Sequence, residues 1–98
     1  MNLYLIRRPS GWRTPEELQA AAERSKEVGD GQMSDDIRWI RSYVVDENDG
    51  GLGTICIYQA TSPEKIREHA ELADLPATDI FKIADMVVVR PDPVPTEA

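Results

Sequence analysis

The chain has 98 residues, of which 41% are hydrophobic and 30% charged, a composition typical of one globular domain and not of a disordered chain. Its net charge of −7 disfavours nucleic acid and anionic membranes as partners, because both attract basic surfaces. No apolar run approaches the ~20 residues that span a membrane, and the single cysteine, Cys56, excludes an intramolecular disulfide, so a cytoplasmic location is expected.

The first predicted elements are a strand and a helix. Residues 2–8 (NLYLIRR) form a short apolar and aromatic run, and residues 9–11 (PSG) are typical of a turn. The segment Thr14-Pro15-Glu16-Glu17 combines an N-cap threonine, a proline at the first helical position and a glutamate able to bond back to the cap. The helix that follows is expected to end at Gly29. One stripe of it carries Leu18, Ala21, Ala22, Ser25 and Val28.

A hairpin is predicted next. Residues 37–45 (IRWIRSYVV) and 52–60 (LGTICIYQA) are rich in β-branched and aromatic side chains, and residues 46–51 (DENDGG) between them are strong turn formers. The two runs therefore predict antiparallel neighbours in a sheet.

A second helix and a last strand complete the pattern. Ser62-Pro63-Glu64 repeats the cap-and-proline start, and the helix is expected to run to about Ala73, before Leu75-Pro76. Residues 81–90 (FKIADMVVVR) predict the final strand, and residues 92–98, with two more prolines, predict a flexible tail.

The predicted order β-α-β-β-α-β indicates an α+β, ferredoxin-like domain over residues 1–91, with a four-stranded antiparallel sheet and both helices on one face. Several strands are apolar on both faces, for example Leu3 and Leu5 against Tyr4 and Ile6. Because an antiparallel sheet with one wet face should alternate more cleanly, a second copy is expected to cover the other face. A homodimer is therefore predicted, and the strand that leads into a histidine-bearing helix over the sheet resembles that of the dimeric α/β-barrel proteins.

His69, the only histidine, lies on the helical stripe of Ile66, Ala70 and Ala73 and is expected to face the sheet. There it is either a base, a ligand or a hydrogen-bond anchor, or a core histidine bonded to a backbone carbonyl. Cys56 and Tyr58 share one strand face, because side chains alternate along a strand.

These groups predict a small-ligand pocket between the second helix and the sheet, lined by His69, Tyr58 and Cys56. Trp39 and Tyr43, on the neighbouring strand, would add aromatic walls to it, or else simply pack in the core. Too few soft ligands are present for a closed zinc site, and Gly50 to Gly53 lie in the hairpin and not in a phosphate-binding context.

From residue 3 to about residue 93 the chain resembles a family of small ferredoxin-like proteins of unknown function that includes a nickel-binding protein. The stretches that carry the resemblance are residues 38–44 (RWIRSYV), 56–60 (CIYQA) and 66–70 (IREHA), followed by Leu75-Pro76. The resemblance implies nickel as a cofactor, with His69 as its ligand. It also supports the prediction that the five candidate site residues share one pocket. Arg7-Arg8 departs from the family pattern, in which an acidic residue often precedes the arginine.

Three functions are compatible with these residues. The first is a noncatalytic binding protein for nickel or a small molecule, since imidazole suits nickel. The second is a cofactor-independent enzyme similar to the monooxygenases of the dimeric α/β-barrel class, with His69 as base and Tyr58 as hydrogen-bond partner of a small aromatic substrate. The third is a structural or interaction module.

Overall fold

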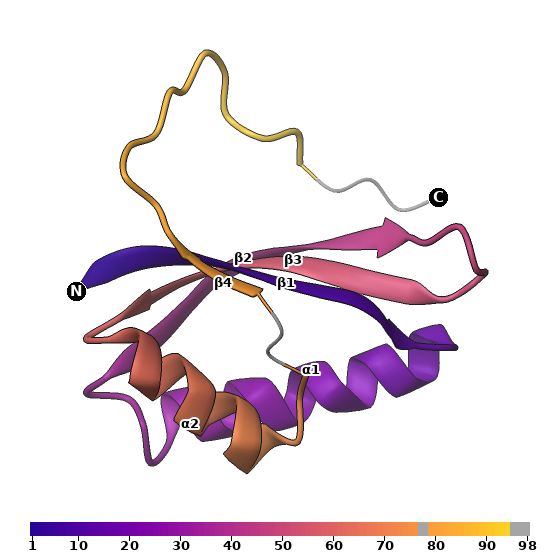
Figure 1. Ribbon diagram of the computed structural model, residues 1–98, viewed down its shortest axis with the longest axis horizontal. Helices are drawn as coiled ribbons and strands as arrows, with labels where there is room; N and C mark the ends of the chain where they lie inside the picture. The colour runs from indigo at the N-terminus through magenta and orange to yellow at the C-terminus, as the bar shows by residue number, and fades with distance from the viewer. Residues whose placement is uncertain (77–78, 95–98) are drawn as a thin grey trace.

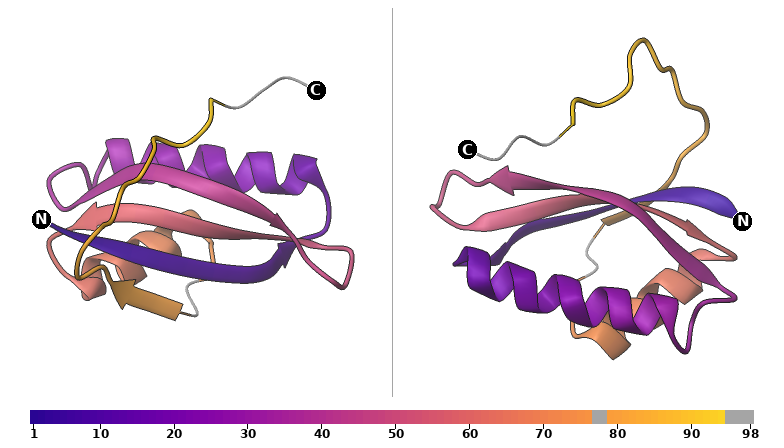
Figure 2. Two further views of the ribbon diagram at one scale, coloured as in Figure 1. Left: turned by 90° about the horizontal axis from the view of Figure 1, so that it is seen from above. Right: turned by 180° about the vertical axis from the view of Figure 1, so that it is seen from behind.

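Six elements follow one another in the order β-α-β-β-α-β in the computed structural model, which describes residues 1–76 and 79–94 (Figure 1). The elements are β1 (Asn2–Trp12), α1 (Pro15–Asp30), β2 (Ile37–Asp46), β3 (Leu52–Ala60), α2 (Pro63–Ala73) and β4 (Asp79–Lys82). The strands form one antiparallel sheet in the order β2-β3-β1-β4, and both helices cover one of its faces (Figure 2). The predicted ferredoxin-like fold is confirmed.

Local chemistry sets the start of each helix as the sequence predicts. The Thr14 hydroxyl accepts a hydrogen bond from the Glu17 amide at 3.1 Å, and the Ser62 hydroxyl accepts one from the Lys65 amide at 3.3 Å. These bonds satisfy amide groups that have no partner within the first turn of a helix. The Glu17 carboxylate differs from the prediction, because it accepts a hydrogen bond from the Arg13 amide at 3.1 Å, one residue before the cap, and not from the Thr14 amide.

The end of α1 differs from the prediction. The helix continues through Gly29 to Asp30 and is capped by Gly31, which has φ −93° and is not left-handed. Gly29 instead packs beside the second helix, where a Cβ atom would lie 3.7 Å from Nε2 of His69. Gly29 thus lies beside the imidazole, inside the helix, and does not end it.

The ends of the first and last strands also differ from the prediction. β1 continues past the predicted turn to Trp12, because an irregularity after Arg8, with Ser10 at φ 51°, lets the strand pair with β3 again at Leu52. β4 ends at Lys82, not at residue 90. Its antiparallel partner β1 starts at Asn2, and after the bond from the Ile83 amide to the Leu3 carbonyl β1 offers almost no further partner.

The two faces of the sheet are buried to different degrees. The face toward the helices carries the fully buried core, with Tyr4, Ile6, Cys56, Tyr58 and Ala60. The opposite face, here called the outer face, carries the half-buried side chains of Leu3, Leu5, Ile55 and Ile57. No helix in the described part of the chain is long and apolar enough to cross a membrane.

The segment after β4 turns back across the outer face (Figure 1). Asp92 forms an ion pair with Arg41 of β2 at 2.5 Å and accepts a hydrogen bond from the Tyr43 hydroxyl. This residue belongs to the predicted tail 92–98, of which residues 95–98 lie outside the described residues. The start of the tail is therefore held by contacts with β2.

Candidate functional site

A cavity of about 590 Å³ lies on the helix side of the sheet, between α1 and the strands, and is called the α1 cavity below. Its volume falls within the range of roughly 300–1,000 Å³ that small-molecule sites usually have. Its apolar walls include Trp12, Leu18, Ala22, Trp39, Val44 and Leu75. Its polar groups include Arg8, Ser25, Thr54, Cys56 and Tyr58.

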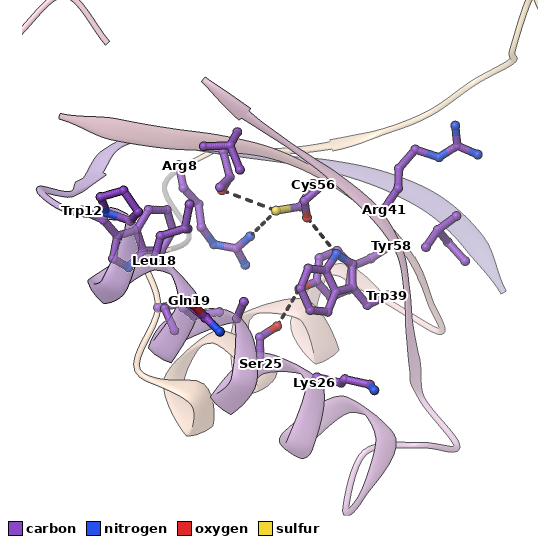
Figure 3. Close-up of a pocket in the computed structure, with 18 residues that line it drawn as sticks. Arg8, Trp12, Leu18, Gln19, Ser25, Lys26, Trp39, Arg41, Cys56 and Tyr58 are labelled. Carbon is purple, nitrogen blue, oxygen red and sulfur yellow. Dashed lines mark hydrogen bonds between the residues drawn. The ribbon is translucent and has the colours of Figure 1, made fainter. Parts of the chain in front are cut away.

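Alternation along β3 and β1 places the polar groups at the base of the cavity (Figure 3). Cys56 and Tyr58 of β3 face the helices, as the sequence predicts, and Arg8 of β1 faces the same side. The Tyr58 hydroxyl shares a hydrogen bond of 2.8 Å with the Ser25 hydroxyl of α1. Helix and sheet are thus tied together at the cavity base.

A β-bulge in β2 separates the two aromatic residues that were expected to act together. Trp39 pairs with Tyr58, Arg41 pairs with Ile57, and Ile40 between them is the extra residue. Trp39 therefore lines the cavity and stacks on Tyr58, with ring centroids 6.1 Å apart and an interplanar angle of 7°. Tyr43 pairs with Ile55 on the outer face, and so its predicted role as a wall of this cavity is wrong.

His69 is fully buried, as its helical stripe predicts, but it is not among the described residues that line the α1 cavity. Its Nε2–H donates to the Ser25 carbonyl at 2.9 Å, and its ring centroid lies 5.4 Å from that of Tyr58. Because a carbonyl only accepts, the proton resides on Nε2, and Nδ1 has no partner among the described residues. His69 therefore supports the cavity from behind, as a hydrogen-bond anchor.

Burial holds both ring groups in their neutral forms. Desolvation raises the pKa of Tyr58 to about 12, partly offset by its hydrogen bond with Ser25 and by the charge of Arg8. Desolvation also lowers the pKa of His69, against the opposing effect of its bond to the Ser25 carbonyl. Near neutral pH the cavity base therefore presents a phenol, and its support is an uncharged imidazole.

The titration of His69 provides a direct check of this arrangement. Since His69 is the only histidine, its C2–H proton resonance is unique, and we expect NMR to give a pKa below 6.5 with the Nε2–H tautomer. When the pH falls below the ordinary histidine pKa of 6.5, the unfolded chain binds a proton at His69 before the folded chain does. The free energy of unfolding therefore decreases as the solution becomes more acidic. Between about pH 7 and pH 5.5, unfolding free energy should fall more steeply in wild type than in His69→Gln. Equal slopes, or a pKa above 6.5, would contradict this description.

Arg8 lies at the centre of the site, although it is not among the site residues that the sequence predicts. Its side chain is 2% exposed, and its guanidinium lies 5.9 Å above the centre of the Tyr58 ring. Nε donates to the Pro76 carbonyl at 2.6 Å, and Nη1 donates to the Cys56 sulfur at 3.1 Å. Nη2 has no partner among the described residues. Because side chains alternate along a strand, Arg8 lies on the same helix-facing side of β1 as Tyr4 and Ile6. This alternation is the sequence signal that predicts its position.

The residues near His69 do not fit a nickel site. The described chain contains no group of three His, Cys, Asp or Glu side chains close enough to hold one metal ion. Nε2 of His69 is already engaged, and Cys56 is in contact with the positive charge of Arg8, which opposes a second cation. Near His69, one chain therefore offers a metal ion at most one ligand atom, Nδ1 of the imidazole.

Comparisons with known proteins identify relatives of the same fold. A family model described as "Nickel responsive protein SCO4226-like" matches residues 4–83. The crystal structure of SCO4226 from Streptomyces coelicolor A3(2) is similar with a TM-score of 0.68, covering 87% of this chain and 99% of that chain at 14% identity. A search of curated proteins found no match. Because the family model spans most of the domain, this chain belongs to the SCO4226-like family of nickel-responsive proteins.

Proposed function

We propose that this chain is a noncatalytic small-ligand-binding protein and that the α1 cavity is its binding site. The observation that carries the proposal is the cavity itself: it has ligand-sized volume, mainly apolar walls, and a few polar groups that converge at its buried base. Sites for small molecules commonly combine these three properties.

An enzymatic role similar to that of the monooxygenases is less well supported. Cys56 donates to Thr54 and accepts from Arg8, and no hydrogen bond joins it to His69 among the described residues. A general base needs to reach the proton that it removes, but His69 is separate from the residues that line the cavity. The described groups therefore favour binding over base catalysis.

Tryptophan fluorescence tests the proposed function, because both tryptophans of the chain, Trp12 and Trp39, line the α1 cavity. Phenylbutyrate, its neutral amide and the corresponding amine serve as probes of acidic, neutral and basic character. We expect at least one of them to change the fluorescence saturably and to raise the thermal midpoint, since a ligand of the folded state stabilises it. If none of the three does either, the proposed function is wrong.

We also propose that the chain forms a homodimer through the outer face of the sheet. The support is the pair of apolar residues that each central strand places there, Leu3 and Leu5 on β1 and Ile55 and Ile57 on β3. Light scattering in dilute buffer should give about twice the chain mass of 11.0 kDa. Ile57→Arg should shift the mass toward that of one chain, because it places a charge on the apolar face. A single-chain mass for wild type at micromolar concentration would contradict the dimer.

Nickel binding is a second candidate function, favoured by the description of the family. A dimer through the outer face would not complete a site at His69, because that residue lies on the helix side of the sheet. We therefore expect calorimetry on protein without a histidine tag to give equal nickel affinities for wild type and His69→Gln. Loss of nickel binding in His69→Gln alone would assign the metal to His69 after all.

A further inference from the structure

Arg8 is a buried cation with unused hydrogen-bonding capacity at the α1 cavity. Of its two terminal nitrogens, Nη1 has only the Cys56 sulfur, a weak acceptor, and Nη2 has no acceptor among the described residues. Its side chain is 2% exposed, and Figure 3 shows the guanidinium projecting from β1 toward Cys56 and the interior of the cavity. A buried charge without a counter-charge is costly, whereas a pair with an anion relieves part of that cost.

The charges that line the α1 cavity all have one sign. Arg8 lies at its base and Lys26 on its wall, while the charge of the third basic lining residue, Arg41, is paired with Asp92 on the outer face. No Asp or Glu is among the described residues that line the cavity. This contrasts with the chain as a whole, which carries 18 acidic and 11 basic side chains. The cavity is therefore a local positive region in an acidic protein, which attracts anions and repels cations.

We propose that the α1 cavity binds an amphipathic monocarboxylate, an inference that rests on the proposed function and specifies its ligand class. The carboxylate accepts hydrogen bonds from Nη1 and Nη2 of Arg8, the parallel arrangement that a guanidinium and a carboxylate favour. It takes the place of the Cys56 sulfur at Nη1 and supplies the acceptor that Nη2 lacks.

The walls determine what the rest of the ligand must be. Trp12 and Leu18 lie on one side of the cavity and Trp39, stacked on Tyr58, on another, so the body attached to the carboxylate is apolar, aromatic or aliphatic. An inorganic anion could bind the guanidinium but would leave these apolar walls in contact with water. A cationic or neutral ligand would leave the charge of Arg8 unpaired.

The charge series of probes tests this inference on the wild-type protein. Phenylbutyrate should bind at least about tenfold more tightly than its amide, since a charge-assisted hydrogen bond is about twice as strong as a neutral one, and the amine should bind more weakly still. Inorganic phosphate should not displace phenylbutyrate at equal concentration. If the amide or amine binds as tightly as the acid, the cavity is a ligand site and the carboxylate inference is wrong. If no probe binds, the proposed function itself fails.

Matched variants locate the charge responsible. Arg8→Gln should weaken phenylbutyrate binding by about tenfold or more and leave amide binding unchanged within about twofold. Arg7→Gln is the control, because it removes the same charge from the adjacent, exposed residue on the other face of β1 and should leave both affinities unchanged. Equal losses in the two variants would assign the effect to net charge and not to Arg8. Should Arg8→Gln fail to fold, the comparison of acid with amide on wild type still decides the inference.

Discussion

Ile66→Ala is expected to destabilise the protein by about 2–5 kcal/mol and to lower the thermal midpoint by roughly 8 °C or more. Ile66 is fully buried on α2 and belongs to the core cluster that includes Ile6 and Tyr58. Truncation to alanine removes buried methyl and methylene groups and leaves a cavity that neighbouring side chains fill only in part. In a domain of this size, such a loss is a large fraction of the total stability.

Leu72→Ala is the matched control, because Leu72 lies on the same helix and is 52% exposed. It loses a side chain of similar size and should change the unfolding free energy by no more than about 0.5 kcal/mol. Chemical denaturation with both variants measures the two values under the same conditions. A similar loss in both, or a loss in Leu72→Ala alone, would contradict the way in which α2 packs on the sheet.

Ala22→Phe is expected to abolish binding of small ligands without unfolding the chain. Ala22 is half-buried on α1 and lines the α1 cavity, so a phenyl ring at this position extends into the space that a ligand would occupy. Since the cavity already exists, the added ring fills space and does not have to displace packed side chains. The fluorescence response of Trp12 and Trp39 to phenylbutyrate should be lost.

Ala20→Phe separates the effect of blocking the cavity from that of adding an aromatic ring to the helix. Ala20 is exposed on the same helix and is not among the residues that line the cavity. This variant should bind phenylbutyrate with wild-type affinity. Retained binding in Ala22→Phe, with a folded protein, would move the ligand site away from α1.

Much of the fold could be predicted from local sequence patterns. Caps at Thr14 and Ser62 set the starts of both helices. Residues 47–51 of the predicted turn connect β2 to β3, and β3 has the predicted limits. These features depend on neighbours in the sequence, and so they are readable there. The inward orientation of His69, Cys56 and Tyr58 could likewise be predicted, because helical and strand periodicities determine it.

Features that depend on strand pairing could not be predicted. The bulge at Ile40 sends Trp39 and Tyr43 to opposite faces, although four residues apart on a regular strand they would share one. The early end of β4 follows from where β1 begins, which the valine-rich sequence of residues 87–89 does not reveal.

Arg8 illustrates a different difficulty. An arginine at the end of an apolar strand is most often exposed, and period-two alternation alone does not show that a cavity lies beside it. The cavity is lined by residues of α1, β1, β2 and β3, which only tertiary packing brings together. The polar groups on the inner face could therefore be predicted more readily than the space that they surround.

The most direct test of the binding site is to follow the NMR chemical shifts of the backbone amides and tryptophan indoles while phenylbutyrate is added to the wild-type protein. A second hollow of about 570 Å³ lies on the other side of the sheet, lined by Arg41, Tyr43 and the segment from Met86 to Asp92, and so it offers an alternative location. Binding in the α1 cavity predicts that the largest shift changes occur at Ala22, Ser25, Cys56 and the two tryptophan indoles. Changes confined to Tyr43 and residues 86–92, with the indoles unaffected, would contradict it.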